Sequence, residues 1–361
     1  MLKIDNLKEI SKMKKSKYYS SIILIMPNED KNIIISDSKG FLHIYESTNN
    51  FKEILTIEFK KENFKSKNNE INFISIKGIN EILITFSELI KCISINKELS
   101  YNKIIYNYKE IFSLSLNLRD FNFYQCISLT SIENQLVSSC LKEIIHSWII
   151  NNNNNNNNSS YRVKKVISVC NKDTSSYLLE IPILKLLVTC SFKDCVLKFF
   201  DLNNNYKLIK RINKIGQGYY EGCLSLINSY LFIISGEGIK GMYLIDGRYK
   251  EIVEYIQING YNGWINCIYA NINYNEINKD KIIFYVGGEF EDNKKNFSCN
   301  FQEYGIVNGE IKLLNNKSDV HDEKMCSIVC YLNSSYKENK NISEKYIFWS
   351  VSKVDIKIWS N

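Results

Sequence analysis

The fold is decided by a stretch near the end of the chain: Tyr346-Ile347-Phe348-Trp349-Ser350-Val351-Ser352-Lys353-Val354-Asp355, which leads into Ile356-Lys357-Ile358-Trp359. An apolar run ends among small hydroxyl residues, a short polar turn follows, and an alternating run closes on an aromatic residue. Alternation of apolar and polar residues is typical of half-buried strands, and a polar turn between two such runs predicts a β-hairpin. We therefore expect two antiparallel strands here.

The same unit recurs along the chain. Four further copies have the same order of apolar run, turn and alternating run, and they lie at residues 33–46, 135–148, 186–201 and 231–246. Glycine and proline account for only 15 and 2 of the 361 residues, so the turns must be built from Asn, Asp, Ser and Lys. A strand–turn–strand unit repeated at intervals of this size predicts an all-β chain built from repeats.

These units resemble the two middle strands of WD40 repeats, and the resemblance covers nearly the whole chain. Candidate inner strands begin near Ser21, Ile71, Cys126, Tyr177, Cys223, Ile265 and Cys326, with spacings of 42 to 61 residues. All but one of these spacings exceed the roughly 40 to 45 residues of the repeat, and the excess falls in stretches rich in Asn and Lys. The resemblance implies one domain over residues 1–361, a seven-bladed β-propeller of four-stranded antiparallel blades with degenerate repeats. Blades two and six are the weakest copies: blade two lacks the closing aromatic residue, and polar residues 291–295 interrupt blade six.

The last blade needs a fourth strand, because the chain ends just after a strand of the third type. Residues 1–20 are predicted to form a closing strand or an N-terminal tail. Their first half, residues 1–10, contains Leu2, Ile4, Leu7 and Ile10. We expect them to supply this strand and so cover an exposed sheet edge. A short amphipathic helix is the alternative. The asparagine run at residues 151–158, within the span 150–160, is predicted to be a disordered surface loop of blade three.

Composition narrows the classes of partner. The net charge is +7 and the pI is about 8.6. A dedicated nucleic-acid domain usually has a pI above ~9, so nucleic acid is not expected as a direct ligand.

The longest apolar run near the start, residues 22–26, is shorter than a membrane span or a signal-peptide core. We therefore expect neither membrane insertion nor export, and a cytoplasmic or nuclear location. Eleven cysteines in such a chain indicate reduced thiols, and three histidines offer no zinc-ligand spacing. No disulfide, metal or cofactor is expected.

Gly236-x-Gly238-x-x-Gly241 matches the dinucleotide-binding fingerprint after a strand-like run. A true site of that kind opens a helix whose N-terminus holds the pyrophosphate. Residues 242–246 instead continue as strand, so we interpret the glycines as a turn in blade five. No Walker A or kinase motif is present, and no small-molecule substrate is expected.

His321 precedes the last inner strand, where WD40 repeats carry a histidine. The resemblance implies a structural network in which His321 bonds to Ser350 and Ser350 bonds to Trp359, completed by an acid in the following turn. Asp355 is the candidate acid, although it lies one residue later than the acid of the family and its turn is one residue shorter. The competing functional reading of His321 is a catalytic base.

The loops that enter the inner strands of blades five and six carry aromatic residues beside glycines. The candidate partner-binding residues are Tyr219, Tyr220, Lys240, Tyr261, Trp264 and Glu289. Aromatic rings on such loops suit a binding surface because Trp and Tyr contribute large contact areas with few rotors to fix. Packing of the same rings into the core is an equal alternative.

The sequence favours a non-catalytic scaffold that holds protein or peptide partners on its loop faces within a multiprotein complex. A propeller of this kind suits scaffolding because a rigid ring of strands presents many loops at fixed geometry. Two alternatives stay open: a nucleic-acid- or chromatin-associated propeller subunit, and a propeller enzyme with converging ionisable residues.

Overall fold

The structure is a computed structural model of the chain. It describes residues 8–14, 23–26, 31–37, 40–47, 51–59, 71–100, 103–115, 123–140, 144–151, 160–168, 176–191, 196–213, 215, 222–236, 241–257, 264–277, 281–291, 297–307, 310–322, 325–333, 345–352 and 355–360. The chain divides into two compact units. One consists of Met1–Ser21, Phe192–Phe200 and Leu208–Asn361, and the other of Ile22–Ser191 and Asp201–Lys207.

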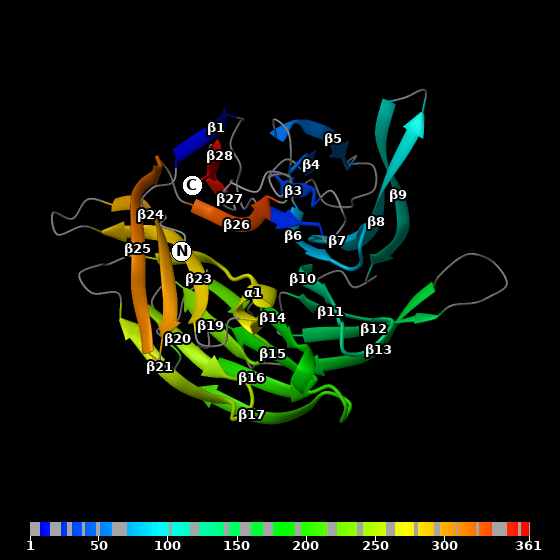
Figure 1. Ribbon diagram of the computed structural model, residues 1–361. Helices are drawn as coiled ribbons and strands as arrows, with labels where there is room; N and C mark the ends of the chain where they lie inside the picture. The colour runs from blue at the N-terminus through cyan, green and yellow to red at the C-terminus, as the bar shows by residue number, and fades with distance from the viewer. Residues whose placement is uncertain are drawn as a thin grey trace. The chain divides into compact units, whose positions relative to one another are not determined.

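The described strands form seven antiparallel sheets of four strands each, so the predicted fold class, a seven-bladed β-propeller, is confirmed (Figure 1). Blade one contains β2 (Ile23–Ile25), β3 (Ile33–Ser36), β4 (Phe41–Tyr45) and β5 (Glu53–Glu58). Blade two contains β6 (Ile71–Ile76), β7 (Glu81–Phe86), β8 (Leu89–Ser100) and β9 (Lys103–Ser115). Blade three contains β10 (Phe123–Ser128), β11 (Gln135–Cys140), β12 (Ile144–Asn151) and β13 (Ser160–Ser168). Blades four and five contain β14 (Ser176–Ile181), β15 (Leu186–Ser191), β16 (Val196–Asp201) and β17 (Lys207–Asn213), and β18 (Gly222–Leu226), β19 (Leu231–Gly236), β20 (Gly241–Asp246) and β21 (Glu251–Gln257). Blade six contains β22 (Trp264–Tyr269), β23 (Lys281–Glu291), β24 (Phe297–Val307) and β25 (Glu310–His321); blade seven contains β26 (Met325–Asn333), β27 (Lys345–Ser352), β28 (Asp355–Ser360) and β1 (Lys8–Lys14).

The inner strands begin close to the predicted positions. The seven observed starts, Ile23, Ile71, Phe123, Ser176, Gly222, Trp264 and Met325, each lie within three residues of the predicted one. The two weakest copies are complete sheets, and the polar interruption of blade six falls between β23 and β24. The described residues also include a single turn of 3₁₀-helix, Pro182–Leu184, and one short helix, α1 (Ile272–Ile277), between β22 and β23.

The fourth strand of blade seven comes from the N-terminal segment. β1 pairs antiparallel with β28, with Lys8 opposite Ser360 and Lys14 opposite Asp355, and the two strands lie side by side in Figure 1, blue beside red. The described strand thus includes the last three of the predicted residues 1–10 and extends past them to Lys14. Residues 1–7 lie outside the described part of the chain. The segment 8–14 is strand and not the alternative helix, because β28 offers it a full edge of backbone donors and acceptors.

Burial follows the position of a strand within its blade. Middle strands such as β3 and β7 are buried along almost their whole length, while the outer strand β17 is exposed at six of its seven residues. A strand covered on both faces reads as a continuous apolar run, which explains the Ile-rich second strands. The core is divided among several clusters, one of which packs the rings of Tyr285, Phe301 and Phe348 against one another.

Two segments singled out in the sequence lie between strands. The asparagine run begins at Asn151, the last residue of β12, and residues 152–159 are outside the described part of the chain.

The glycine motif spans the end of β19 at Gly236 and the start of β20 at Gly241, with residues 237–240 not described. Strand β20 follows the motif. A β-carbon at Gly241 would lie 2.1 Å from the carbonyl oxygen of Ile256, so this glycine permits close pairing of β20 with β21.

Candidate functional site

Of the predicted partner-binding residues, the structure describes two. Tyr219, Tyr220, Lys240 and Tyr261 lie outside the described residues. Trp264 is the first residue of β22, and its backbone lies opposite Glu289 of β23, whose side chain is half-buried. A register shift between Ile265 and Cys267 follows directly. The sheet thus brings Trp264 and Glu289 to the same end of blade six.

A buried chain of hydrogen bonds centred on Ser350 of blade seven begins at the end of blade six. His321, the last residue of β25, has a fully buried side chain, and its Nδ1 lies 2.5 Å from Asp355 Oδ1. Its Nε2 lies 2.8 Å from Ser350 Oγ, and Trp359 Nε1 donates to the same oxygen at 2.9 Å. Ser352 Oγ donates to Asp355 Oδ1 and accepts from the backbone N–H of Asp355. This second serine holds the carboxylate in place in the shortened turn.

The chemistry of these partners fixes the direction of each hydrogen bond. A carboxylate only accepts, so His321 Nδ1 carries the proton that bonds to Asp355. In the neutral imidazole, His321 Nε2 is then an acceptor for the Ser350 hydroxyl, and the serine oxygen accepts the Trp359 N–H. Ser350 is 1% exposed and His321 is 4% exposed, so neither the hydroxyl nor the imidazole of this Asp–His–Ser arrangement is open to a substrate at the surface. The arrangement ties β25, β27 and β28 together.

Blade three has a similar contact between a tryptophan and a serine. Trp148 Nε1 donates to Ser138 Oγ at 2.8 Å, and the ring of the nearby His146 is 5.9 Å from the Trp148 ring. Burial lowers the pKa of His146 to about 4, so this imidazole is neutral at ordinary pH. The sequence carries the signal for this bond, since Ser138 and Trp148 are ten residues apart, close to the nine that separate Ser350 from Trp359.

Eight cysteines whose side chains are described are free and buried; they are Cys92, Cys126, Cys140, Cys190, Cys223, Cys267, Cys299 and Cys330. Burial raises the pKa of Cys92 and of Cys140 to about 12. A thiol with so high a pKa stays protonated, and only the thiolate is a strong nucleophile or metal ligand. Across the part of the chain that is described, no three His, Cys, Asp or Glu residues form a group that could hold a metal ion.

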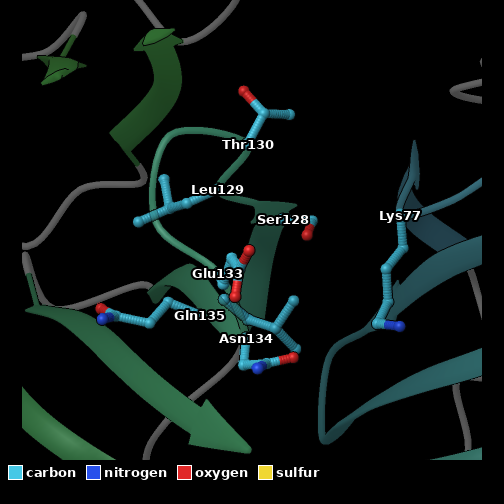
Figure 2. A pocket seen from close by; sticks show the side chains of 8 residues that line it. Lys77, Ser128, Leu129, Thr130, Glu133, Asn134 and Gln135 are labelled. Atoms are coloured by element: carbon cyan, nitrogen blue, oxygen red, sulfur yellow. The ribbon is translucent and has the colours of Figure 1, made fainter.

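A polar hollow of about 270 Å³ lies between the turn after β6 and the turn after β10 (Figure 2). Figure 2 shows Lys77 facing the hairpin of residues 128–136 across the hollow. The Lys77 ammonium is already paired with Glu81, and Gln135 accepts a hydrogen bond from Tyr206 at 3.0 Å. The volume lies just below the usual 300–1,000 Å³ of a ligand pocket, and its lining is polar rather than apolar. Its polar groups stabilise the turns and form no catalytic arrangement.

The turn beside this hollow is held by a buried carboxylate. Glu180 of β14 accepts hydrogen bonds from the backbone N–H and the hydroxyl of both Thr130 and Ser131. Only 8% of Glu180 is exposed. Four donors on one carboxylate fix the β10–β11 turn against the next blade.

Sequence reasoning missed a group of side chains on the turns of blade five. Tyr230 lies between β18 and β19, and Arg248 and Tyr249 lie between β20 and β21. Arg248 and Tyr249 are exposed, and Tyr230 is half-buried. The only signal in the sequence is the order Asp246-Gly247-Arg248-Tyr249, in which an acid at the end of a strand favours a tight turn.

In the described part of the chain, no helix has the length and apolar character that a membrane crossing requires.

The sequence matches no family model and no curated protein. Among solved structures, the chain is similar to Sqt1 of Saccharomyces cerevisiae, with a TM-score of 0.59 and 10% identity over 97% of this chain and 98% of that one. It is also similar to a chain of the mitotic checkpoint complex, with a TM-score of 0.65 and 8% identity over 98% of this chain and 94% of that one. The likeness spans nearly the full length of each protein and shows a shared fold, and the blade number fits the WD40-type propeller that the sequence resembles.

Proposed function

We propose that this protein is a non-catalytic scaffold that holds protein or peptide partners on the loop and turn faces of its propeller, as a subunit of a multiprotein complex. The observation that carries the proposal is the exposure of Arg248 and Tyr249 on a turn that hydrogen bonds hold in one conformation. Exposed aromatic and arginine side chains on a rigid frame are typical of residues that dominate protein interfaces.

The buried ionisable groups support a scaffold more than an enzyme. His321 uses both ring nitrogens inside blade seven, and Glu180 is bound by four donors of one turn. A catalytic site needs a nucleophile, a base or an acid that can reach a substrate. In the described residues, these groups instead connect strands and turns. The mitotic checkpoint complex is a multiprotein assembly by its name, and the similarity of fold to one of its chains agrees with a role in complexes.

Affinity purification after mild crosslinking in cells tests the proposal. We expect tagged protein to retain one or more partners at near-equal amounts, with crosslinks from lysines on turns such as Lys185 and Lys250. A tag-only control measures background. Recovery of the chain alone, with no protein enriched over this control, would contradict the scaffold. Imaging of a fluorescent fusion tests the cytoplasmic or nuclear location that we propose with it.

A further inference from the structure

Blade five gathers an arginine and two tyrosines at one end of its strands. The β18–β19 and β20–β21 turns lie at the same end because the four strands alternate in direction. The guanidinium carbon of Arg248 lies 3.7 Å from the centre of the Tyr230 ring and 5.5 Å from that of Tyr249. Stacking of a guanidinium on aromatic faces restricts its position and is favourable in itself.

A carboxylate fixes the orientation of this guanidinium. Arg248 Nη2 donates to Asp246 Oδ2 at 2.7 Å, and Nε lies 3.1 and 3.2 Å from the two carboxylate oxygens. Among the described residues Nη1 has no hydrogen-bond partner, and 45% of the side chain is exposed. The planar guanidinium therefore presents the donors of Nη1, and one of Nη2, on the side away from Asp246.

The backbone of the turn is fixed as well. Asp246 Oδ1 accepts from the Arg248 N–H at 2.8 Å, and the carbonyl of Asp246 accepts from the Lys250 N–H at 2.7 Å. Gly247 N–H donates to the carbonyl of Tyr230 at 2.8 Å, which joins the two turns. Little conformational freedom remains to be lost on binding, and such preorganisation strengthens binding.

Exposed apolar side chains lie on the β20–β21 turn and on the neighbouring helix α1. Tyr249 is 69% exposed, and Ile277 at the end of α1 is 82% exposed. Helix α1 reaches this region through Glu276, which accepts a hydrogen bond from the N–H of Ser229, the neighbour of Tyr230. The matching turn of blade four differs, because its tyrosine, Tyr206, is only 4% exposed and bonds to Ser147 and Gln135 inside its own unit. A tyrosine with only a structural role in this turn can therefore be buried, and Tyr249 is not.

We propose that Tyr230, Arg248 and Tyr249 form a binding surface for an acidic peptide segment of a protein partner. A carboxylate of the peptide accepts hydrogen bonds from the free side of the Arg248 guanidinium, and a neighbouring apolar side chain packs on Tyr249. A planar carboxylate matches the two parallel donors of a guanidinium. This inference rests on the proposed scaffold function and specifies the chemistry of one partner.

The charges nearby favour a peptide over a nucleic acid. Asp246 neutralises one positive charge, and Glu251 begins the next strand. Lys250, whose ammonium lies 3.3 Å from the carbonyl of Arg248, adds one local positive charge. A phosphate backbone requires a run of positive charges along its path, whereas a single carboxylate flanked by apolar side chains needs only one anchored guanidinium.

An array of synthetic 12-residue peptides, measured with fluorescein-labelled copies by fluorescence anisotropy, tests the surface. Each peptide places one Asp or Glu between apolar residues and has a twin with Asn or Gln. We expect the acidic peptides that bind to do so at least tenfold more tightly than their amide twins. Arg248→Gln should weaken these acidic peptides about tenfold or more and abolish the difference between twins. Arg248→Lys should restore part of it, and Tyr249→Ala should weaken both twins.

Arg211→Gln is the matched control, because its loss changes the net charge equally. Arg211 is an exposed residue of β17, and within the described part of the chain its side chain bonds only to Asn213. Thermal unfolding checks that all variants fold.

The proposal is overturned if no acidic peptide binds, if acidic and amide twins bind equally, or if Arg211→Gln weakens binding as much as Arg248→Gln. It is also overturned if a single-stranded DNA oligonucleotide binds through Arg248 more tightly than any peptide. Retention of every native partner by Arg248→Gln also overturns it, while leaving the scaffold function intact. Absence of native partners for the wild-type chain contradicts the scaffold function instead.

Discussion

Ser350 is the centre of the hydrogen-bonded chain in blade seven, so Ser350→Ala tests this chain most directly. Its hydroxyl bonds to His321 Nε2 at 2.8 Å and accepts from Trp359 Nε1 at 2.9 Å. Alanine differs from serine by this one oxygen and removes both hydrogen bonds. His321 is 4% exposed and Trp359 is 6% exposed, so bulk water does not replace the lost partner.

The expected loss of stability follows from what remains unpaired. A buried donor or acceptor that loses its partner costs about 1 to 3 kcal/mol. Ser350→Ala leaves two such groups, the Trp359 N–H and the His321 Nε2, so we expect the free energy of unfolding to fall by about 2 to 6 kcal/mol. Folded domains have total stabilities of only about 5 to 15 kcal/mol, so the effect is easily measured.

Urea unfolding followed by circular dichroism provides the measurement. The control is Ser225→Ala, because Ser225 is half-buried and, among the described residues, its hydroxyl makes only a 3.5 Å contact to the Leu226 carbonyl. We expect a change within about 0.5 kcal/mol. Trp359→Phe and the double variant complete a cycle, in which the two substitutions should couple by about 0.5 to 3 kcal/mol. If Ser350→Ala unfolds at the same urea concentration as the control, or shows no coupling to Trp359→Phe, the argument from buried hydrogen bonds is wrong.

Three further predictions concern β1, Glu180 and His146. Deleting residues 1–14 removes β1 and exposes the edge of β28, so the midpoint of thermal unfolding should fall and size-exclusion chromatography should show self-association; an unchanged midpoint contradicts this. Glu180→Gln weakens four hydrogen bonds from Thr130 and Ser131 and should lower stability by about 1 to 3 kcal/mol in urea. His146 has its pKa lowered by burial from 6.5 to about 4, so the unfolded chain binds the proton first. The free energy of unfolding should therefore fall, by up to about 3 kcal/mol, as pH drops from about 6.5 to about 4, and this part of the pH dependence should be missing in His146→Gln.

The blades could be predicted from the sequence because their signals are local. Each middle pair of strands is an apolar run, a turn and an alternating run, and nearest-neighbour pairing follows from the short turns. The limits of β1 could not be predicted in this way. They depend on the distant strand β28, whose first residue, Asp355, lies opposite Lys14. Pairing across the length of the chain sets where such a strand begins and ends, and the pattern of residues 1–10 alone does not.

The candidate surface on blade five could not be predicted for a related reason. The sequence gives Arg248 and Tyr249 as two polar residues in a turn, and Tyr206 occupies a matching turn of blade four. Only the fold decides that Tyr206 meets Ser147 and Gln135 in its own unit and that Tyr249 meets solvent. In blade seven the resemblance to the WD40 repeat named His321 as a structural residue. The hydroxyl of Ser352, which holds Asp355 in the shortened turn, is a detail that residue spacing does not reveal.

Polar side chains connect the inner part of one blade to that of the next blade. Because these side chains contribute to stability, substitutions that change binding are better tolerated at other positions. Gln125 of β10 accepts from the Leu178 N–H at 2.7 Å, and the Tyr269 hydroxyl donates to the Cys330 carbonyl at 2.6 Å. Asn275 of α1 donates to the Ile227 carbonyl at 2.7 Å. Inner strands of different sheets do not share a ladder of backbone hydrogen bonds, so these side chains satisfy backbone groups that would otherwise be buried without a partner. Substitutions at such residues alter stability and binding together. Substitutions at exposed turn residues leave these connections intact, and the turns can therefore change partners while the sheets keep the fold.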